Sequence, residues 1–236
     1  MTTYLATVSP SAVWRGVIFD LDGTLLDSLA DLADCMNRVL ARQGLPIWPR
    51  DAYRQFIGDG LRMLVQRALP EDWRHPEVVD ACTAAMNAEY AAHWADQTRP
   101  YDGIPEMLDG LAAQGVVLAV FSNKPDEFVA PTVRRFFPEV PFVATVGARA
   151  GVPRKPDPTG ALQIAAAAGL APTECLYLGD SGIDMQTAVR AGMLAVGARW
   201  GFRDAAELQA HGAAVLIDHP TRLLTDFRFA ASSSRA

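Results

Sequence analysis

The sequence predicts an α/β fold, a doubly wound parallel sheet of the Rossmann-like kind with a second, all-helical part inserted into it. Short apolar runs alternate with helical segments over most of the chain, which is the pattern of a parallel sheet covered by helices. Residues 28–97 contain no strand signal, although strand signals occur on both sides of them. We therefore expect a split core of residues 1–26 and 98–236, interrupted by a helical cap of residues 27–97.

The core strands are expected where apolar runs end in polar or glycine residues. These runs are Val17–Phe19, Val116–Phe121, Phe142–Val146, Cys175–Leu178, Leu194–Val196 and Ala213–Ile217. The second is apolar throughout, which is typical of a central parallel strand that is buried on both faces. Helices are expected between them, among them an alanine-rich helix over Thr159–Gly169 and a short one over Asp204–Ala210.

The insert is expected to contain three helices. Apolar residues spaced by three and four predict the first helix after Ser28, the second over Leu61–Leu69 and the third over Pro76–Trp94. Ser28 and Asp31 have the spacing of a capping box, so we expect them to cap the first helix.

Composition excludes several classes of function. The 236 residues carry a net charge of −6, which argues against binding to nucleic acid or to an anionic membrane. The three cysteines form no C-x-x-C pair, so a zinc site or disulfide framework is not expected. Met1–Pro10 lacks the features of a signal peptide, and no apolar run reaches membrane-spanning length. We expect a cytoplasmic monomer or homodimer with a disordered tail over residues 231–236.

The most informative stretch is Asp20-Leu21-Asp22-Gly23-Thr24, directly after the first strand. In an open α/β sheet, ligands bind beyond the carboxyl ends of the strands, so both carboxylates are expected at a site. Side chains alternate along a strand, so Asp20 and Asp22 share a face only if the chain stays extended. A turn at Gly23 would instead let Asp22 fold over whatever Asp20 contacts.

Three further motifs follow strands or precede helices. Ser122 and Asn123 follow the Val116–Phe121 run, and the Ser122 hydroxyl with the Asn123 backbone N–H suits the binding of phosphoryl oxygens. Lys155 stands before the alanine-rich helix, where a positive charge suits an anion. Asp180 and Asp184 follow the Cys175–Leu178 run and suit a hard cation such as Mg²⁺. Taken singly, each motif is equally well explained by a turn, an exposed lysine or a helix cap.

Taken in order, the four motifs resemble those of the haloacid dehalogenase superfamily, most of whose members are phosphatases. The resemblance implies that Asp20 is the nucleophile and Asp22 the general acid and base. It implies that Ser122 and Lys155 hold the transferring phosphoryl group, with Thr24 and Asn123 as further substrate contacts. The implied Mg²⁺ ligands are Asp20, Asp180, Asp184 (directly or through water) and the main-chain carbonyl of Asp22. An insert after the first strand resembles the lid of capped members.

The substrate is expected to be selected by the insert. In Gly58-Asp59-Gly60-Leu61-Arg62, Gly60 allows a close approach of the backbone to a ligand. Arg62 in the following turn suits a bidentate pair with a substrate carboxylate, although a solvated arginine is an equal alternative. A wider set of residues resembles phosphoglycolate phosphatases: Leu26–Leu29, Asn37, Gly58–Gly60, Ser122–Lys124 and Arg199–Phe202. The resemblance implies hydrolysis of 2-phosphoglycolate to glycolate.

Other functions stay open at this point. A phosphatase or phosphomutase acting on an amino-sugar phosphate, a sugar phosphate or pyrophosphate has the same motifs. Phosphonate cleavage is disfavoured because residues 27–97 contain no lysine for a Schiff base. A non-catalytic phosphate sensor is disfavoured because Asp20, Asp22 and the acidic metal ligands are all present. The expected partner is a small phosphorylated metabolite, with no nucleic acid and no membrane.

Overall fold

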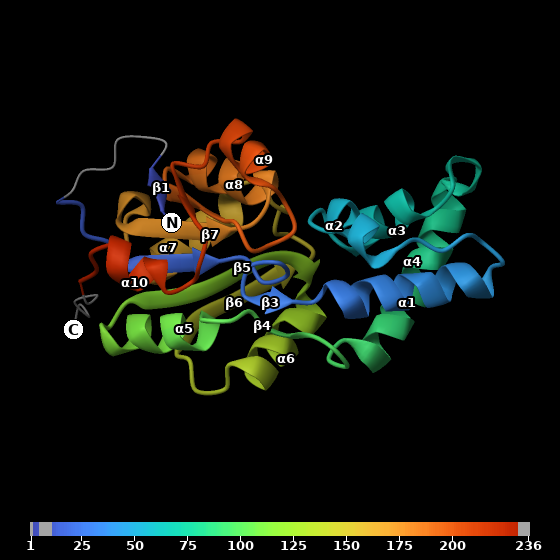
Figure 1. The fold of residues 1–236 in the computed structure, drawn as a ribbon, viewed down its shortest axis with the longest axis horizontal. Coiled ribbons are helices and arrows are strands. Elements are labelled where there is room, and N and C mark those ends of the chain that lie inside the picture. The colour runs from blue at the N-terminus through green and yellow to red at the C-terminus, as the bar shows by residue number, and fades with distance from the viewer. Residues whose placement is uncertain (1, 5–10, 231–236) are drawn as a thin grey trace.

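A seven-stranded sheet forms the centre of the computed structural model, which describes residues 2–4 and 11–230 (Figure 1). In spatial order the strands are β1 (Thr3–Tyr4), β9 (Val215–Ile217), β8 (Leu194–Ala198), β7 (Cys175–Gly179), β2 (Gly16–Phe19), β5 (Val117–Pro125) and β6 (Phe142–Ala148). Six strands of this sheet are parallel. The seventh, β1, lies at the sheet edge and pairs antiparallel with β9. The predicted Rossmann-like sheet is confirmed.

Helices cover both faces of this sheet (Figure 1). One face packs against α5 (Ile104–Ala113), α6 (Asp126–Phe136) and α10 (Arg222–Asp226), and the other against α7 (Thr159–Ala167), α8 (Gly182–Ala191) and α9 (Ala205–Ala210). Strand β2 shows why both faces are apolar. Val17 and Phe19 belong to the hydrophobic cluster beneath α5, α6 and α10, and Ile18 belongs to the cluster beneath α7, α8 and α9, because side chains alternate along a strand.

The insert packs around a hydrophobic cluster of its own, at one end of the core (Figure 1). Its helices are α1 (Leu29–Arg42), α2 (Tyr53–Phe56), α3 (Leu61–Ala68) and α4 (Pro76–His93), with 3₁₀ turns at Arg50–Ala52 and Glu71–Trp73. The chain enters and leaves it through a two-stranded antiparallel ribbon of β3 (Leu26–Asp27) and β4 (Arg99–Pro100). Phe128 and Phe202 of the core join the cluster of the insert, so the two parts are in direct contact.

The remaining 3₁₀ turn, Pro172–Glu174, precedes β7. The insert helices lie within a residue or two of their predicted bounds, whereas β1, α2, α10 and the 3₁₀ turns were not predicted. Strand β5 continues past Phe121 to Pro125, because Pro125 still lies opposite Ala148 of β6. No helix among the described residues has the length and apolar character needed to cross a bilayer. The tail predicted to be disordered, 231–236, lies outside the described residues.

The predicted capping box at the start of α1 is wrong. Ser28 is the N-cap residue, but its side chain makes no capping hydrogen bond and instead donates to Asp22 Oδ1 at 2.7 Å. Asp31 accepts hydrogen bonds from the backbone N–H groups of Gln97 and Thr98, where the chain leaves the insert. Both side chains thus bind partners outside the first turn of α1 instead of capping it.

Candidate active site

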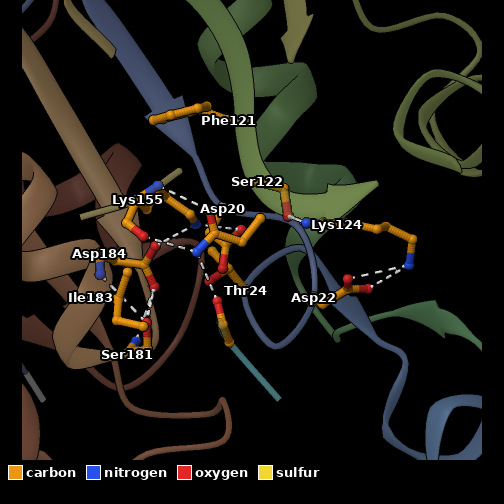
Figure 2. A network of polar contacts seen from close by, with 12 residues as sticks. Asp20, Asp22, Thr24, Phe121, Ser122, Lys124, Lys155, Ser181, Ile183 and Asp184 are labelled. Carbon is orange, nitrogen blue, oxygen red and sulfur yellow. Dashed lines mark hydrogen bonds and ion pairs between the residues drawn. The ribbon is translucent and has the colours of Figure 1, made fainter. Parts of the chain in front are cut away.

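The carboxyl ends of β2, β5 and β7 bring the four sequence motifs together (Figure 2). Strand β2 lies between β5 and β7, and from it the chain builds the sheet first toward β6 and then toward β9. Such a reversal of strand order is where α/β sheets bind ligands. Asp20 follows β2, Ser122 lies within the end of β5, and Asp180 follows β7.

Asp20 lies beside a buried lysine. Lys155 Nζ is 2.8 Å from Asp20 Oδ1 and donates a hydrogen bond to Asp184 Oδ1 at 2.7 Å. Burial and the nearby Asp184 carboxylate raise the pKa of Asp20 to about 6, although Lys155 opposes this. Asp20 therefore carries its charge at neutral pH, as a nucleophile must.

Asp184 is held in place by the first turn of α8. Its Oδ2 accepts hydrogen bonds from the Ser181 N–H at 3.1 Å and from the Ser181 hydroxyl at 2.6 Å. Ser181 Oγ in turn accepts from the Asp184 N–H, which completes a capping box. Local helix capping thus orients Asp184 toward Lys155.

Three buried carboxylates form a cluster beside Lys155. Asp20, Asp180 and Asp184 each place an oxygen within 4.8 Å of those of the other two. Burial and the two neighbouring carboxylates raise the pKa of Asp180 to about 8. Lys155 is the single cation that pairs with the cluster among the described residues. One positive charge against three buried carboxylates leaves an excess of negative charge, which fits a divalent cation with oxygen ligands.

Gly23 explains the packing of the first motif against Asp180. Its φ of +89° lies in the left-handed region, and a Cβ there would lie 2.3 Å from Asp180 Oδ2. Thr24 is buried on the same turn and donates to Asp180 Oδ1 at 3.0 Å. The N–H of Phe202 donates to Asp180 Oδ2 at 2.7 Å.

The turn at Gly23 sends Asp22 in a different direction from Asp20. Lys124 Nζ lies 2.9 Å from Asp22 Oδ1 and 3.2 Å from Oδ2, and Figure 2 shows the Asp22 carboxylate pointing toward Lys124. Lys124 Nζ also donates to the Tyr90 hydroxyl at 2.7 Å. Tyr90 belongs to α4 of the insert, so this second group of polar residues connects core and insert.

A cleft opens between the core and the insert above Asp20 and Asp22. Its polar lining includes Ser122, Asn123, Lys124 and Tyr90, and Gly60 contributes backbone at the start of α3. Apolar side chains form the rest of its wall: Leu32, Ile57, Leu61, Leu64 and Phe128. The cleft is therefore partly apolar, and a ligand in it can reach Asp20.

Comparison with known proteins identifies the family. Residues 17–198, which contain all four motifs, match the haloacid dehalogenase-like hydrolases. The chain belongs to this family. The match begins in β2 and ends with β8, so it spans the whole insert.

Several relatives within this family are phosphoglycolate phosphatases. A phosphoglycolate phosphatase of Pseudomonas putida is 35% identical over 91% of this chain and 80% of its own length. One of Mannheimia succiniciproducens is 33% identical over 89% of this chain and 93% of its own. Together with the family, these relatives support hydrolysis of a phosphoric monoester.

Solved structures share the fold. A protein from Lactobacillus delbrueckii subsp. bulgaricus superposes with a TM-score of 0.86 at 30% identity, over 92% of this chain and 99% of its own. A protein from Haemophilus somnus, described as a predicted phosphoglycolate phosphatase, gives a TM-score of 0.83 at 29% identity, over 90% and 97%.

Two predicted substrate-binding residues, Arg62 and Thr24, do not line the cleft. Arg62 Nε pairs with Asp80 at 2.8 Å on the partly exposed surface of the insert, and Arg62 is not among the cleft residues. The Thr24 hydroxyl binds Asp180 rather than facing the cleft. The carboxylate of Asp22 is not part of the carboxylate cluster, and the metal contact of its main-chain carbonyl stays a prediction.

Asn123 has a contact that the sequence did not suggest. Its side-chain amide donates to the carbonyl oxygens of Gly58 at 3.0 Å and Lys155 at 3.1 Å, and its Oδ1 accepts from the Lys155 N–H at 2.9 Å. One side chain thus connects the insert to the loop that carries Lys155.

Lys124 and Tyr90 are the site residues that sequence reasoning missed. Lys124 stands beside Ser122 and Asn123, so its position in the motif was the available signal. Tyr90 lies on a helix with no motif at all, and only the packing of α4 against the core brings it to Lys124.

Proposed function

We propose that this protein is a Mg²⁺-dependent phosphatase that hydrolyses 2-phosphoglycolate to glycolate and phosphate through an aspartyl-phosphate on Asp20. The position of Asp20 is the main support for this proposal. Its carboxylate lies at the base of the cleft, beside Lys155 and within a cluster of carboxylates suited to a divalent cation. The names of the relatives support the choice of substrate.

In the first half of the reaction, a carboxylate oxygen of Asp20 attacks phosphorus in line with the ester oxygen. The bond between phosphorus and the ester oxygen breaks, and its electron pair leaves with the glycolate oxygen. Asp22, in its acid form, gives that oxygen a proton. Lys155 and the Ser122 hydroxyl hold the transferring oxygens, since phosphoryl transfer depends mainly on positioning and charge neutralisation.

In the second half, water attacks the phosphorus of the aspartyl-phosphate. Asp22, now ionised, accepts a proton from this water, and the bond between phosphorus and Asp20 breaks to release phosphate. Asp20 returns as a carboxylate, and Asp22 returns to its acid form.

Asp20, Asp180 and Asp184 are the residues that would hold Mg²⁺. The bound ion supplies neutralisation of the charge that develops on the phosphoryl oxygens. Thr24 and the Phe202 N–H orient Asp180, and the capping box at Ser181 orients Asp184. Residues 27–97 act as a cap that excludes bulk water from the first step.

The test is phosphate release from purified protein with a panel of phosphomonoesters. The panel contains 2-phosphoglycolate, glucose 6-phosphate, glucosamine 6-phosphate and pyrophosphate, each with Mg²⁺ and with a chelator. We expect the highest kcat/KM for 2-phosphoglycolate, with no turnover in chelator. A sugar phosphate as the best substrate contradicts the substrate assignment. Conversion of glucose 6-phosphate to an isomer without phosphate release would indicate a mutase instead.

A further inference from the structure

Lys124 is a second buried lysine of the site, and the proposed phosphoryl chemistry does not use it. The chain contains 21 lysine and arginine residues, of which only Lys124 and Lys155 are lysines. Both are buried. Lys155 pairs with Asp20 and Asp184, whereas Lys124 is the only cationic side chain among the described residues that line the cleft.

The contacts of Lys124 keep it charged. Burial disfavours its charge, but the Asp22 carboxylate and the Tyr90 hydroxyl outweigh burial and raise the pKa of Lys124 above its ordinary value. The ammonium group also lies 4.8 Å from the centre of the Tyr90 ring, which adds a cation–π contact. Asp22 is the one carboxylate that pairs with Lys124 in the described structure.

This pairing conflicts with the role of Asp22 in catalysis. As general acid, Asp22 must reach the ester oxygen beside Asp20, but its carboxylate points toward Lys124 (Figure 2). Departure of Asp22 would leave a buried ammonium group without a counter-charge, which is strongly unfavourable. Another anion must therefore replace Asp22 at Lys124 before Asp22 takes part in the reaction.

We propose that Lys124, together with the Tyr90 hydroxyl, binds the carboxylate of the substrate in exchange for Asp22. Lys124 is then a specificity-determining residue that selects phosphomonoesters with a carboxylate close to the ester oxygen. Once displaced from the ammonium group, the Asp22 carboxylate takes up a proton from water in the cleft, so the exchange produces the general acid only when such a substrate is present. This inference rests on the proposed function and names the residues that recognise the non-reacting end of the substrate.

The rest of the cleft agrees with a short anionic substrate. Leu32, Leu61, Leu64 and Phe128 offer no hydrogen bonds to the hydroxyl groups of a sugar. Arg62, the cation that the sequence suggested for a substrate carboxylate, pairs with Asp80 and does not line the cleft. Among the described side chains of the cleft, Lys124 and Tyr90 are thus the donors best placed for a carboxylate.

The first test compares three esters that differ in charge at one position. They are 2-phosphoglycolate, its primary amide and phosphoethanolamine, assayed with the unaltered protein, Lys124→Met, Tyr90→Phe and Arg62→Met. We expect Lys124→Met to lower the preference in kcat/KM for the carboxylate over the amide by on the order of 10- to 100-fold. Tyr90→Phe should lower it several-fold, and Arg62→Met should leave it unchanged. Comparing this ratio between each variant and the unaltered protein cancels the intrinsic reactivity of each ester.

Other outcomes overturn the proposal. If Lys124→Met slows all three esters equally, Lys124 only positions Asp22. If Arg62→Met alone lowers the preference, the carboxylate binds to Arg62. If the unaltered protein prefers sugar phosphates, the proposed function fails, and with it the identity of the carboxylate substrate.

A binding measurement separates these failures and does not require turnover. With lysine isotopically labelled, the protein gives only two lysine side-chain NMR signals, and Lys124→Met identifies which is which. In the Asp20→Asn background with Mg²⁺, we expect 2-phosphoglycolate to shift the Lys124 signal and its amide to leave that signal unmoved. An equal shift with both ligands, or none with 2-phosphoglycolate, overturns the carboxylate exchange even if the protein proves to be a phosphatase. Circular dichroism of each variant checks that it is folded.

Discussion

The two aspartates of the first motif lie in opposite kinds of surroundings. Asp20 belongs to a group formed entirely by the core, in which Lys155 and two further carboxylates are held by strand ends and a helix cap. Asp22 belongs to a group shared with the insert, in which Tyr90 comes from α4. The first group is built to stay in one arrangement, whereas contacts in the second depend on how insert and core meet.

This difference matches the different requirements of the nucleophile and the general acid in the proposed reaction. The nucleophile needs a fixed position and a neutralised charge, which the core provides. The general acid must respond to the substrate, and a partner across the junction of core and insert allows this.

The largest effect is expected for the nucleophile. Asp20→Asn should lower kcat by on the order of 10⁶-fold, the loss that follows removal of a catalytic nucleophile. Folding should be preserved, because the change removes one of three mutually repelling buried carboxylates. Phosphate release and thermal unfolding measure the two effects. Turnover close to that of the unaltered protein would disprove the proposed mechanism.

The general acid should show a smaller effect that depends on the leaving group. Asp22→Asn should lower kcat for 2-phosphoglycolate by about 10²- to 10⁴-fold. With p-nitrophenyl phosphate the leaving group needs no proton, so the first turnover should stay fast while hydrolysis of the aspartyl-phosphate slows. A burst of p-nitrophenol in rapid mixing measures this. A first turnover slowed as much as with 2-phosphoglycolate would contradict the role of Asp22 as proton donor.

The carboxylate cluster makes stability depend on pH. The pKa of Asp20 is raised to about 6 and that of Asp180 to about 8, so the folded state binds more protons than the unfolded state between about pH 4 and 8. Without a divalent cation, the melting temperature should therefore fall as pH rises through this range. Added Mg²⁺ should raise it most at pH 8, because the cation binds the ionised cluster.

The matched control for this pH effect is Asp180→Asn. It should flatten the decline in melting temperature between pH 6 and 8, since it removes the carboxylate whose pKa is raised to about 8. Asp34 and Glu89 have pKa values below their ordinary range, so they do not titrate there. A decline of the same steepness in the variant would assign it to other groups.

The smallest effect is expected for the hydroxyl that contacts Asp22. Ser28→Ala removes one hydrogen bond to Asp22 Oδ1, and Lys124 keeps its own. A hydrogen bond of this kind contributes about 1.5 to 3 kcal/mol when one partner is charged, so kcat/KM should fall by on the order of 10- to 100-fold. A loss as large as that of Asp22→Asn would mean that Ser28, rather than Lys124, controls the position of Asp22.

Much of the fold was predictable because the sequence carries local signals for it. The apolar run Val17–Phe19 is long enough only for a strand, and the strand is present at the centre of the sheet. The missed elements are short: β1 has two residues and α10 has five. Such elements form because of tertiary packing, so local propensity does not reveal them.

The site was predictable where one motif brings its own partners. Ser181 and Asp184 lie three residues apart, so helix capping alone orients them. The capping box expected at Ser28 failed because Asp22 offered a charged acceptor that only the folded chain brings near.

Apolar periodicity and strand-end residues are local properties of the chain, so the sheet, the helices of residues 27–97 and the order of the four motifs could be predicted from the sequence alone. The sequence could not predict which cation pairs with each carboxylate. Lys155 pairs with Asp20 and Lys124 with Asp22, whereas Arg62 does not line the cleft. Asp22 and Lys124 are 102 residues apart in the chain, so their 2.9 Å contact exists only once β2 and β5 have paired.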